Sequence, residues 1–296
     1  MVNIRIMEKG TKKYYYLEHT LRTGNSFKNK RMYLGSFLPK DIEKIMERFM
    51  YEVYMEIYEK PLESIKKNFN QEIASFPKSA YDRFIELFMI RFTYDSTRIE
   101  GSTLTLKETA DLLQEEVTPK GKSLRDVKET EAHRNVFYKM LRHTGDLTLA
   151  TTLEWHHELF KEVDPEIAGA IRKHPVAIAR SKVELALPAE IDPLLHEFFQ
   201  WYKKNNIHPV IKAALVHLRF VTIHPFSDGN GRMSRIMMNF VLHKNGYPML
   251  NIEYINRNSY YNALEKSQLQ KRDEYFIQYF LKKYVKTHKK YVKSHY

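Results

Sequence analysis

The stretch that decides the fold is His224-Pro-Phe-Ser-Asp-Gly-Asn-Gly-Arg-Met-Ser-Arg235. An apolar helix is predicted over 209–223, directly before it, and a second helix begins near Arg232. The glycines at 229 and 231 allow backbone N–H groups to approach a ligand closely. The first turn of the second helix also presents N–H groups that have no partner inside the helix. The spacing therefore predicts an anion-binding loop between two helices.

The charged side chains of this stretch indicate a polyphosphate ligand. Arg232 and Arg235 are three residues apart, so both project from one side of the first helical turn, where they oppose the helix dipole. A highly charged anion would offset that cost. Asp228 would repel such an anion unless a hard cation such as Mg²⁺ lies between them. His224, at the entrance of the loop, is then placed to accept a proton from an attacking hydroxyl.

The stretch resembles the signature of the Fic (filamentation induced by cAMP) family, HPFx[D/E]GNGRxxR, and matches it at every fixed position. The resemblance extends over about 76–269 and includes, in the expected order, SLRDVKETEAHRNV, DPEIAGAIRKHPVAI, HPVIKAALVHLRFVTIHPF and SYYNAL. Most Fic proteins similar to this one transfer AMP from ATP to a hydroxyl side chain of a protein. The resemblance implies an all-helical core with one β-hairpin flap.

The resemblance also implies a role for each residue of the site. His224 would be the general base that deprotonates a Ser, Thr or Tyr hydroxyl of the target, and Asp228 would hold Mg²⁺ against the phosphates of ATP. Arg232 would contact the phosphates, and Arg235 the γ-phosphate. The other nucleotide-binding groups that it implies are the N–H groups of Gly229, Asn230 and Gly231, the aromatic pair Tyr260 and Tyr261, and the flap residues Ile178, Ala179, Arg180 and Ser181.

The segment Ser96-Thr-Arg-Ile-Glu-Gly101 matches the family's inhibitory motif, [S/T]xxxE[G/N], whose fixed positions are Ser96, Glu100 and Gly101. It resembles the class II type, in which an inhibitory helix precedes the core. Gly101 favours a helix end, which places Glu100 at a helix C-terminus, where a carboxylate is disfavoured by about 0.3–1 kcal/mol. A cation would offset this, and by resemblance that partner is Arg235, so that the pair takes the place of the γ-phosphate. The same carboxylate could orient a water molecule, which leaves removal of AMP open as an alternative.

The rest of the chain predicts a mainly helical protein with a small N-terminal module. Residues 2–38 are β-rich and are interrupted at Gly10 and Gly24, which predicts a small antiparallel sheet. A helix is expected to follow over 39–60. The expected domains are an N-terminal module over 1–70, a Fic domain over 71–270 with its inhibitory helix at about 80–101, and a basic helical extension over 271–296.

Periodicity predicts the elements of the helical part. The alternation in VAIARSKVELAL predicts a hairpin flap over 175–187. Helices are expected at 77–101, 104–116, 126–143, 149–160, 165–171, 193–203, 209–223, 232–244, 259–269 and 273–290.

Composition narrows the class of protein. The 296 residues are 43% hydrophobic and 13% aromatic, which excludes a disordered chain. Cysteine is absent, which rules out disulfides, cysteine-ligated zinc and thiol nucleophiles, and is compatible with a reducing compartment. The opening MVNIRIMEKG lacks an apolar run, and no stretch of about 18 apolar residues occurs, so we expect a cytoplasmic protein without a membrane span.

The net charge of +12 lies at the two ends of the chain. Residues 1–40 carry +7 and residues 282–296 carry +6. Basic ends attract nucleic acid or anionic membranes, or they are simply solvated lysines. Tyr14, Tyr15 and Tyr16 interleave with cations as in a stacking platform, and target docking or dimer packing is the other interpretation. The cations are Lys12, Lys13, Arg22, Lys28, Lys30 and Arg31.

The leading hypothesis is a Mg²⁺-dependent protein adenylyltransferase that modifies target proteins and itself and that Glu100 inhibits by pairing with Arg235. One alternative is an enzyme that mainly removes AMP, or that uses another nucleotide donor at the same site. Another is a nucleic-acid-binding regulator that acts through the basic N-terminal sheet. Homodimers are common among similar proteins, and the composition does not establish one here.

Overall fold

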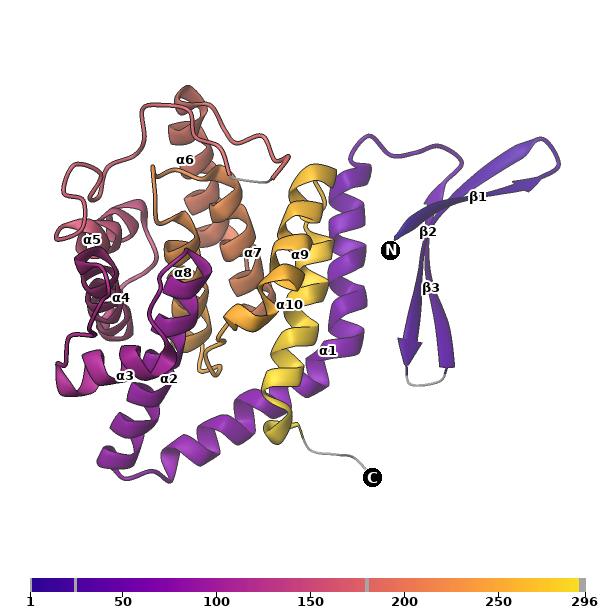
Figure 1. Ribbon diagram of the computed structural model, residues 1–296. Helices are drawn as coiled ribbons and strands as arrows, with labels where there is room; N and C mark the ends of the chain where they lie inside the picture. The colour runs from indigo at the N-terminus through magenta and orange to yellow at the C-terminus, as the bar shows by residue number, and fades with distance from the viewer. Residues whose placement is uncertain (1, 24–25, 179–180, 293–296) are drawn as a thin grey trace. The chain divides into compact units, whose positions relative to one another are not determined.

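The computed structural model describes residues 2–23, 26–178 and 181–292 (Figure 1). The chain divides into two compact units, Met1–Ser64 and Ile65–Tyr296. The division falls inside one long helix, α1 (Ile42–Ala74), as does the boundary near residue 70 that the sequence suggests. A single helix therefore continues from one unit into the other.

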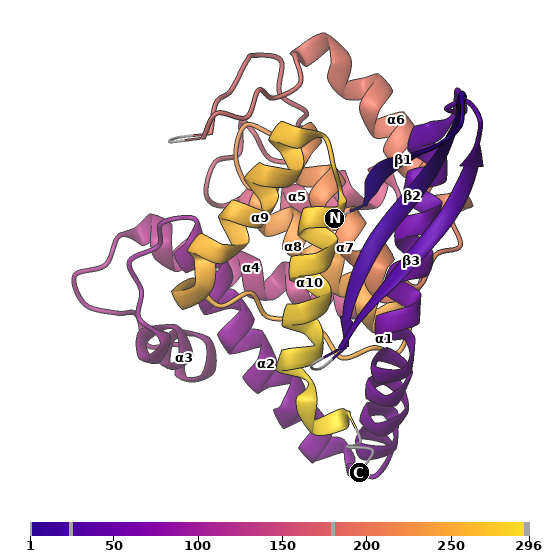
Figure 2. The same cartoon turned by 90° about the vertical axis from the view of Figure 1, so that its right-hand side faces the viewer.

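The first unit begins with an antiparallel sheet, which confirms the predicted β-rich segment (Figure 2). Its strands β1 (Asn3–Lys9), β2 (Lys12–Thr23) and β3 (Ser26–Gly35) lie in that order. Gly10 adopts a φ of 64° in the two-residue turn between β1 and β2, a conformation that costs glycine little. Gly24, expected at the second turn, lies outside the described residues.

Helix α1 is longer than predicted. The sequence suggests an end at Lys60, but the helix runs on through Pro61 to Ala74. Proline removes one N–H donor from a helix, yet buried apolar residues continue beyond it at Leu62 and Ile65. The prediction is wrong at this end because the apolar stripe outweighs the loss of one hydrogen bond.

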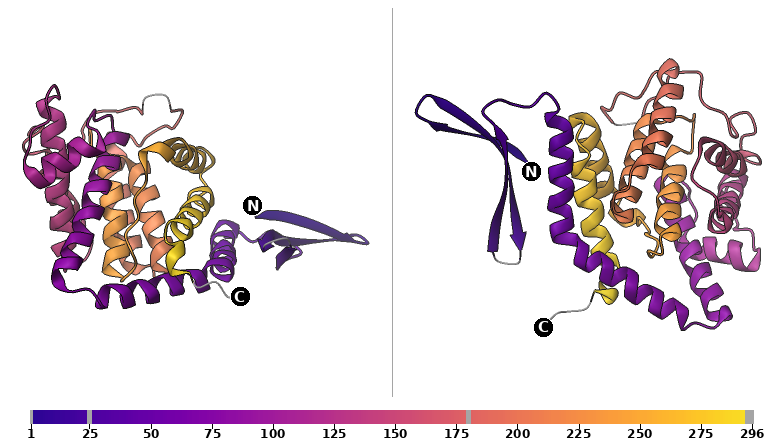
Figure 3. Two further views of the ribbon diagram at one scale, coloured as in Figure 1. Left: turned by 60° about the horizontal axis from the view of Figure 1, so that its bottom comes forward. Right: turned by 180° about the vertical axis from the view of Figure 1, so that it is seen from behind.

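The regular structure in the described part of the second unit is helical. Helices α7 (Pro209–Ile223) and α8 (Asn230–Lys244) pack side by side at its centre (Figures 1 and 3). Helix α8 is buried from Arg232 to Leu242, as expected of a helix enclosed on every side. Around them lie α2 (Lys78–Ile99), α3 (Leu106–Glu115), α4 (Leu124–Arg142), α5 (Leu149–Phe160), α6 (Pro188–Lys204), η1 (Tyr254–Asn256), α9 (Arg257–Gln270), α10 (Glu274–Thr287) and η2 (Lys289–Tyr291).

Local signals explain where several helices begin. The side chains of Thr105, Ser123 and Thr148 each accept a hydrogen bond from the N–H three residues later, and so cap α3, α4 and α5. Helix α10 packs on α7 and α9 and buries Phe276 and Phe280, so the basic C-terminal segment contributes to the helical core. Across the described residues, we find no helix with the length and apolar character that crossing a bilayer requires.

The predicted short helix over 165–171 is wrong, because the chain forms consecutive turns over 165–169. Gly169 ends them with a φ of 71°. Its N–H donates to Nδ1 of His156 at 3.0 Å, and a Cβ at this position would lie 3.1 Å from the Leu153 carbonyl oxygen. Docking of Gly169 against α5 therefore replaces continuation of the helix.

The predicted β-hairpin over 175–187 is also absent from the described residues, since neither 175–178 nor 181–187 contains a strand. A single turn bond is present, from the N–H of Ser181 to the Ile178 carbonyl. The carbonyls of His174 and Ala186, which could have joined a ladder, accept instead from the guanidinium of Arg172 at 3.0 and 2.6 Å. The alternating pattern therefore does not lead to strand pairing in the described residues, and the side chain of Arg172 satisfies these carbonyls instead.

Candidate active site

The loop 224–229 between α7 and α8 is closed by its own residues. The side-chain amide of Asn230 accepts from the Phe226 N–H at 2.9 Å and donates to the Phe226 carbonyl at 2.8 Å. Gly229 begins α8 with a φ of 81°, and a Cβ there would lie 2.4 Å from the Phe160 ring. Glycine is therefore required at 229 by both backbone and space. The first N–H groups of α8 have no carbonyl one turn earlier and remain available to an anion.

His224 ends α7 in the left-handed conformation, with a φ of 53°. Its Nδ1 lies 3.1 Å from the Val221 carbonyl oxygen, and because a carbonyl only accepts, Nδ1 carries the proton. Burial lowers the pKa of His224, and the Val221 carbonyl opposes that shift only in part. The ring is therefore neutral at pH 7 and has an acceptor lone pair on Nε2.

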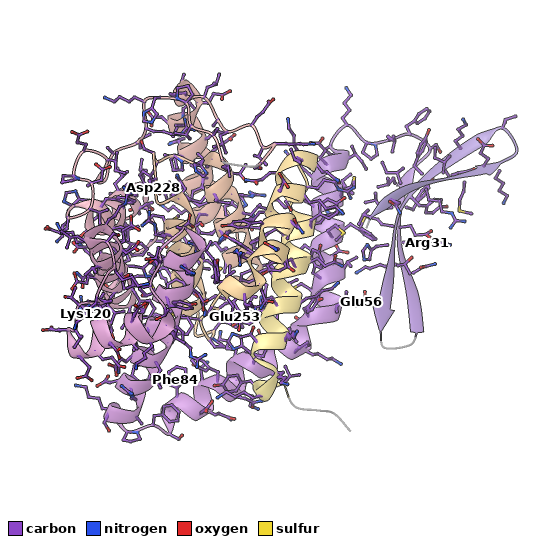
Figure 4. The ribbon with its side chains drawn as sticks, in the orientation of Figure 1. Arg31, Glu56, Phe84, Lys120, Asp228 and Glu253 are labelled. Atoms are coloured by element: carbon purple, nitrogen blue, oxygen red, sulfur yellow. The ribbon has the colours of Figure 1, made fainter. Side chains whose placement is uncertain are left out.

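Asp228 lies in the loop, where Figure 4 labels it. Its Oδ1 accepts from Nη2 of Arg232 at 3.0 Å, and its Oδ2 accepts from Nη2 of Arg125 at 3.3 Å. Burial alone would raise the pKa of Asp228, but Arg232 and the Gly229 N–H outweigh it, so the pKa lies below its ordinary value. The carboxyl is therefore ionised at neutral pH.

The two arginines of α8 are both buried, each with 1% of its surface exposed. Arg232 lies between Asp228 and Glu129, whose Oε2 is 3.1 Å from Nη1, and its guanidinium lies 4.9 Å from the centre of the Phe160 ring. Glu129 also accepts from Arg125 at 2.8 Å. Because buried cations need partners, Glu129 holds Arg232 in place at the base of the loop.

Arg235 contacts the end of α2. Its Nη2 lies 2.6 Å from Oε1 of Glu100 and 3.0 Å from the Ser96 carbonyl oxygen, while its Nε donates to Oγ of Ser96 at 2.9 Å. The expected ion pair between Glu100 and Arg235 is thus present. Burial opposes the charged form of Arg235, but Glu100 outweighs it and raises the pKa of the arginine.

Glu100 occupies the C-cap of α2 and is followed by Gly101 at a φ of 112°, so the helix ends where the sequence predicts. Its carboxylate reaches the first turn of α8. A Cβ placed on Gly231 would lie 2.2 Å from Oε1 of Glu100, closer than any contact allows. A side chain at 231 would therefore push the Glu100 carboxylate away, and this carboxylate lies directly against the first turn of α8.

His156 of α5 supports the loop from below and stacks on Phe226 with ring centres 3.6 Å apart. The N–H of Gly169 donates to its Nδ1, so Nε2 carries the proton and donates to the Asp228 carbonyl at 3.1 Å. Burial lowers the pKa of His156 to about 4. The neutral ring is therefore a structural part of the loop.

Arg172 links the loop to the flap segment, which we define as residues 173–187. Its Nε donates to the His224 carbonyl at 2.8 Å, while its other nitrogens donate to His174 and Ala186 as described above. Farther along the flap segment, Oγ of Ser181 donates to Oε1 of Glu265 in α9 at 2.9 Å. Ile178 is partly exposed, and the predicted Ala179 and Arg180 lie outside the described residues.

The two predicted aromatic residues differ in their surroundings. Tyr260 is 1% exposed, and its hydroxyl lies 2.9 Å from Nε2 of His217 and 3.5 Å from Nη1 of Arg235. Tyr261 is exposed, and its hydroxyl donates to the Ile99 carbonyl at 3.2 Å. In this conformation Tyr260 supports Arg235 from within the core, whereas Tyr261 borders the end of α2.

Residues 146–242, which contain the loop and both buried arginines, match the model of the Fic/DOC family. These residues are similar to a Fic domain. Helices α5, α7 and nearly all of α8 lie within these residues, whereas α2, which carries Glu100, lies outside them.

Curated proteins named Fic are similar to this chain. The chain is 33% identical over 183 residues to the protein adenylyltransferase Fic of Aedes aegypti, and 34% identical over 178 residues to that of Drosophila melanogaster. These alignments cover 60% and 58% of this chain. The chain spans only 36% of the length of each relative.

Solved structures agree with the Fic fold. A Fic domain containing signaling protein from Bacteroides thetaiotaomicron aligns with a TM-score of 0.69 and 26% identity, over 78% of this chain and 95% of that one. Fic-1 from C. elegans aligns with a TM-score of 0.68 and 23% identity, over 88% of this chain and 78% of that one. The second likeness supports the fold alone.

Sequence reasoning missed four residues that shape this site: Arg125, Glu129, His156 and Arg172. Arg125, Glu129 and Arg172 lie in segments that carry the resemblance, but no local pattern reveals their roles. The residues that join them to the loop and to α8 are 52 to 103 residues away. A buried-looking charge in an amphipathic helix, such as Glu129, is the one signal available.

Proposed function

We propose that this chain is a protein adenylyltransferase, which transfers AMP from ATP to a Ser, Thr or Tyr hydroxyl of target proteins and of itself. The observation that carries the proposal is the arrangement around α8. A neutral histidine, His224, offers Nε2 beside a helix N-terminus that is flanked by two buried arginines. Such a set combines a proton acceptor with a polyphosphate site.

The reaction follows from these groups. The target hydroxyl oxygen attacks the α-phosphorus of ATP and forms a new O–P bond, while the bond from that phosphorus to the bridging oxygen breaks and pyrophosphate leaves. The hydroxyl proton passes to Nε2 of His224. The N–H groups of Gly229, Asn230 and Gly231 and the guanidinium of Arg232 stabilise the phosphate charge, and Arg235 binds the γ-phosphate. Positioning and charge stabilisation supply most of the rate.

The residues present also fit a magnesium ion. Mg²⁺ is usually held by one or two carboxylates together with phosphate oxygens and water. Asp228 is ionised and partly exposed, and its Oδ2 contacts only the exposed Arg125 in the hydrogen bonds of the described residues. Asp228 would hold the ion, which neutralises phosphate charge when bound.

We propose that Glu100 inhibits this reaction. Its carboxylate engages Arg235 at 2.6 Å and lies against Gly231, so it takes both the cation and the space that a γ-phosphate requires. ATP that enters beside Glu100 is expected to be displaced, with its α-phosphorus out of line for attack. Ser96 strengthens this state because it holds the same guanidinium at 2.9 Å.

Self-labelling with α-³²P-ATP and Mg²⁺ tests both proposals without a known target. We expect strong labelling of Glu100→Gly, weak labelling of the wild type and none of Glu100→Gly/His224→Ala. Glu116→Gly is a matched control, because Glu116 also caps a helix C-terminus but lies on α3. Absence of label in every folded, ATP-binding variant would overturn AMP transfer, and equal labelling of wild type and Glu100→Gly would overturn the inhibition.

Removal of AMP is a second candidate that one observation favours. The Glu100 carboxylate lies beside the same helix turn and could orient a water molecule toward a bound phosphate. If this activity dominates, wild-type protein will release AMP from a modified substrate, and Glu100→Gly will lose that release.

Competition by UTP or CDP-choline against labelled ATP would indicate a different nucleotide donor.

We also propose that the chain acts in the cytoplasm, which the absence of cysteine supports. Expressed with a fluorescent tag, it should fractionate with cytoplasmic markers.

The nucleic-acid alternative depends on a different surface, the N-terminal sheet, and does not compete with AMP transfer at this site.

A further inference from the structure

One face of the N-terminal sheet carries a row of tyrosines. In the strand register, Tyr16 lies opposite Arg5 on β1 and opposite Tyr33 on β3, while Tyr14 lies two residues away on the same face. The ring centres of Tyr33 and Tyr16 are 5.1 Å apart, and those of Tyr33 and Tyr14 are 6.3 Å apart. We call this surface the tyrosine face; it also includes Lys12 and Arg31.

The opposite face of the sheet is buried along the middle of β2, at Leu17 and His19, whereas Ile4 and Ile6 of β1 on the same face are 41% and 51% exposed. Leu17 is fully buried, and Lys30 lies 3.3 Å from Glu56 of α1. Because side chains alternate along a strand, Tyr15 lies on this buried-side face and leaves the platform that the sequence suggested. By contrast, Tyr33 on the tyrosine face is 54% exposed. Tyr33 contributes an aromatic ring that is open to a partner.

The cations of the tyrosine face are held in place. Oε2 of Glu18 lies 2.6 Å from Nε of Arg31, labelled in Figure 4, and 3.2 Å from Nη1 of Arg5. Glu18 thus fixes two guanidinium groups. Each guanidinium has further N–H groups that do not bond to Glu18. With Lys12, the face carries more positive than negative charge, in a segment whose first 40 residues carry +7. The side chains of Arg22 and Lys28 lie outside the described part of the sheet.

We propose that the tyrosine face binds single-stranded nucleic acid. Bases stack on Tyr33 and Tyr16, while Arg5, Arg31 and Lys12 contact the phosphates. Exposed aromatic rings favour a single strand over a duplex, because the bases of a duplex already stack on one another. The cations favour nucleic acid over an apolar or basic protein surface. Strands of this length offer room for about two or three stacked bases.

Fluorescence anisotropy with the full chain tests the proposal. Labelled 12-nucleotide dT and rU strands and a 12-base-pair duplex are titrated at 50, 100 and 200 mM salt. We expect tighter binding of the single strands, a rise in Kd of about 5- to 100-fold in Tyr33→Ala, and little change in Tyr33→Phe. Arg31→Ala should reduce the slope of log K against log salt by about 0.7.

Two controls make the result specific. Phe37→Ala removes an exposed aromatic ring of the same unit that lies outside β3, and it should not change Kd. Self-labelling of Tyr33→Ala in the Glu100→Gly background should be unchanged, so that nucleic-acid binding and AMP transfer are judged separately. Absence of single-strand binding by folded protein at 50 mM salt would overturn the proposal. Equal Kd values for the duplex, the single strand and polyglutamate would also overturn it. An unchanged Kd in Tyr16→Ala/Tyr33→Ala would do the same.

Discussion

The loop 224–229 and the flap segment 173–187 border the same candidate site, yet they are held in different ways. The loop is held by neighbours in the sequence: His224 bonds to Val221, and the Asn230 side chain bonds to Phe226 in both directions. The flap segment is held from outside by Arg172 and by Glu265, which lies 84 residues beyond Ser181. A short motif can therefore specify the loop, whereas the flap segment depends on distant partners.

Arg172 joins the two regions, because it donates to a carbonyl of the loop and to two carbonyls of the flap segment, those of His174 and Ala186. The comparison makes a general prediction. Changes in the loop should affect the chemical step, changes at Arg172 should affect both regions, and changes in the flap segment should affect mainly the protein substrate.

The largest effect is expected for His224→Ala in the Glu100→Gly background, which removes the proton acceptor from the loop. The rate of self-labelling should fall by about 10²- to 10⁴-fold, while ATP affinity changes little. The pH dependence of Glu100→Gly gives a second test. Because burial lowers the pKa of His224, the rate should hold as pH falls to 6.5 and decline only below it. His196→Ala, an exposed histidine on α6, is the control.

The next effect concerns the link between the two regions. Arg172→Met keeps the apolar stem but leaves three carbonyls without their donor, so the free energy of unfolding should fall by about 4 kcal/mol. Urea denaturation followed by circular dichroism measures this. Lys173→Met, the exposed neighbouring residue, should change it by less than about 0.5 kcal/mol. Equal losses in the two variants would show that Arg172 does not anchor the flap segment.

Acid should destabilise the support beneath the loop. Since the pKa of His156 is about 4 in the folded chain and near 6.5 when unfolded, the unfolded state binds more protons between these values. Stability is therefore lost as pH falls from 6.5 to 4, by about 3 kcal/mol for this one residue. His156→Gln can retain both hydrogen bonds and does not titrate. The pH dependence of its unfolding free energy should be weaker by that amount.

A smaller loss is expected from the closure of the loop. Asn230→Ala removes the two bonds to Phe226 and should lower the free energy of unfolding by about 2 kcal/mol. Thermal denaturation measures the change. Asn256→Ala is the control, because that exposed side chain bonds only to Glu253 in the described contacts. If Asn230→Ala lowers the free energy of unfolding by less than Asn256→Ala does, the Asn230 side chain does not hold the loop closed.

The smallest effect is expected at the flap anchor. Glu265→Ala frees Ser181 and the Lys182 N–H, which are partly exposed or exposed, so stability should change by about 0.5 kcal/mol or less. Trans-labelling of an added protein substrate should show a raised KM, whereas ATP affinity stays unchanged. A change in ATP affinity would instead indicate that Glu265 contributes to nucleotide binding. It would contradict the prediction that changes in the flap segment affect mainly the protein substrate.

Several features of the molecule could be read from the sequence. The ends of α2 and α7 follow from Glu100-Gly101 and His224-Pro225, since glycine and proline stop helices. The N-terminal sheet follows from alternation and from Gly10. The ion pair between Glu100 and Arg235, which are 135 residues apart, was expected only through the resemblance to Fic proteins. Local sequence signals place Glu100 at the end of α2 and Arg235 near the start of α8, but they do not show that the two side chains meet.

The sequence by itself determined the ends of α2 and α7 and the local closure of the loop 224–229, because these depend on residues within one or two turns of each other. Only the tertiary structure decided which buried charges pair, as with Glu129 and Arg232, and how the flap segment is held. The physical reason is that burial and pairing depend on distant neighbours, which periodicity and propensity do not encode.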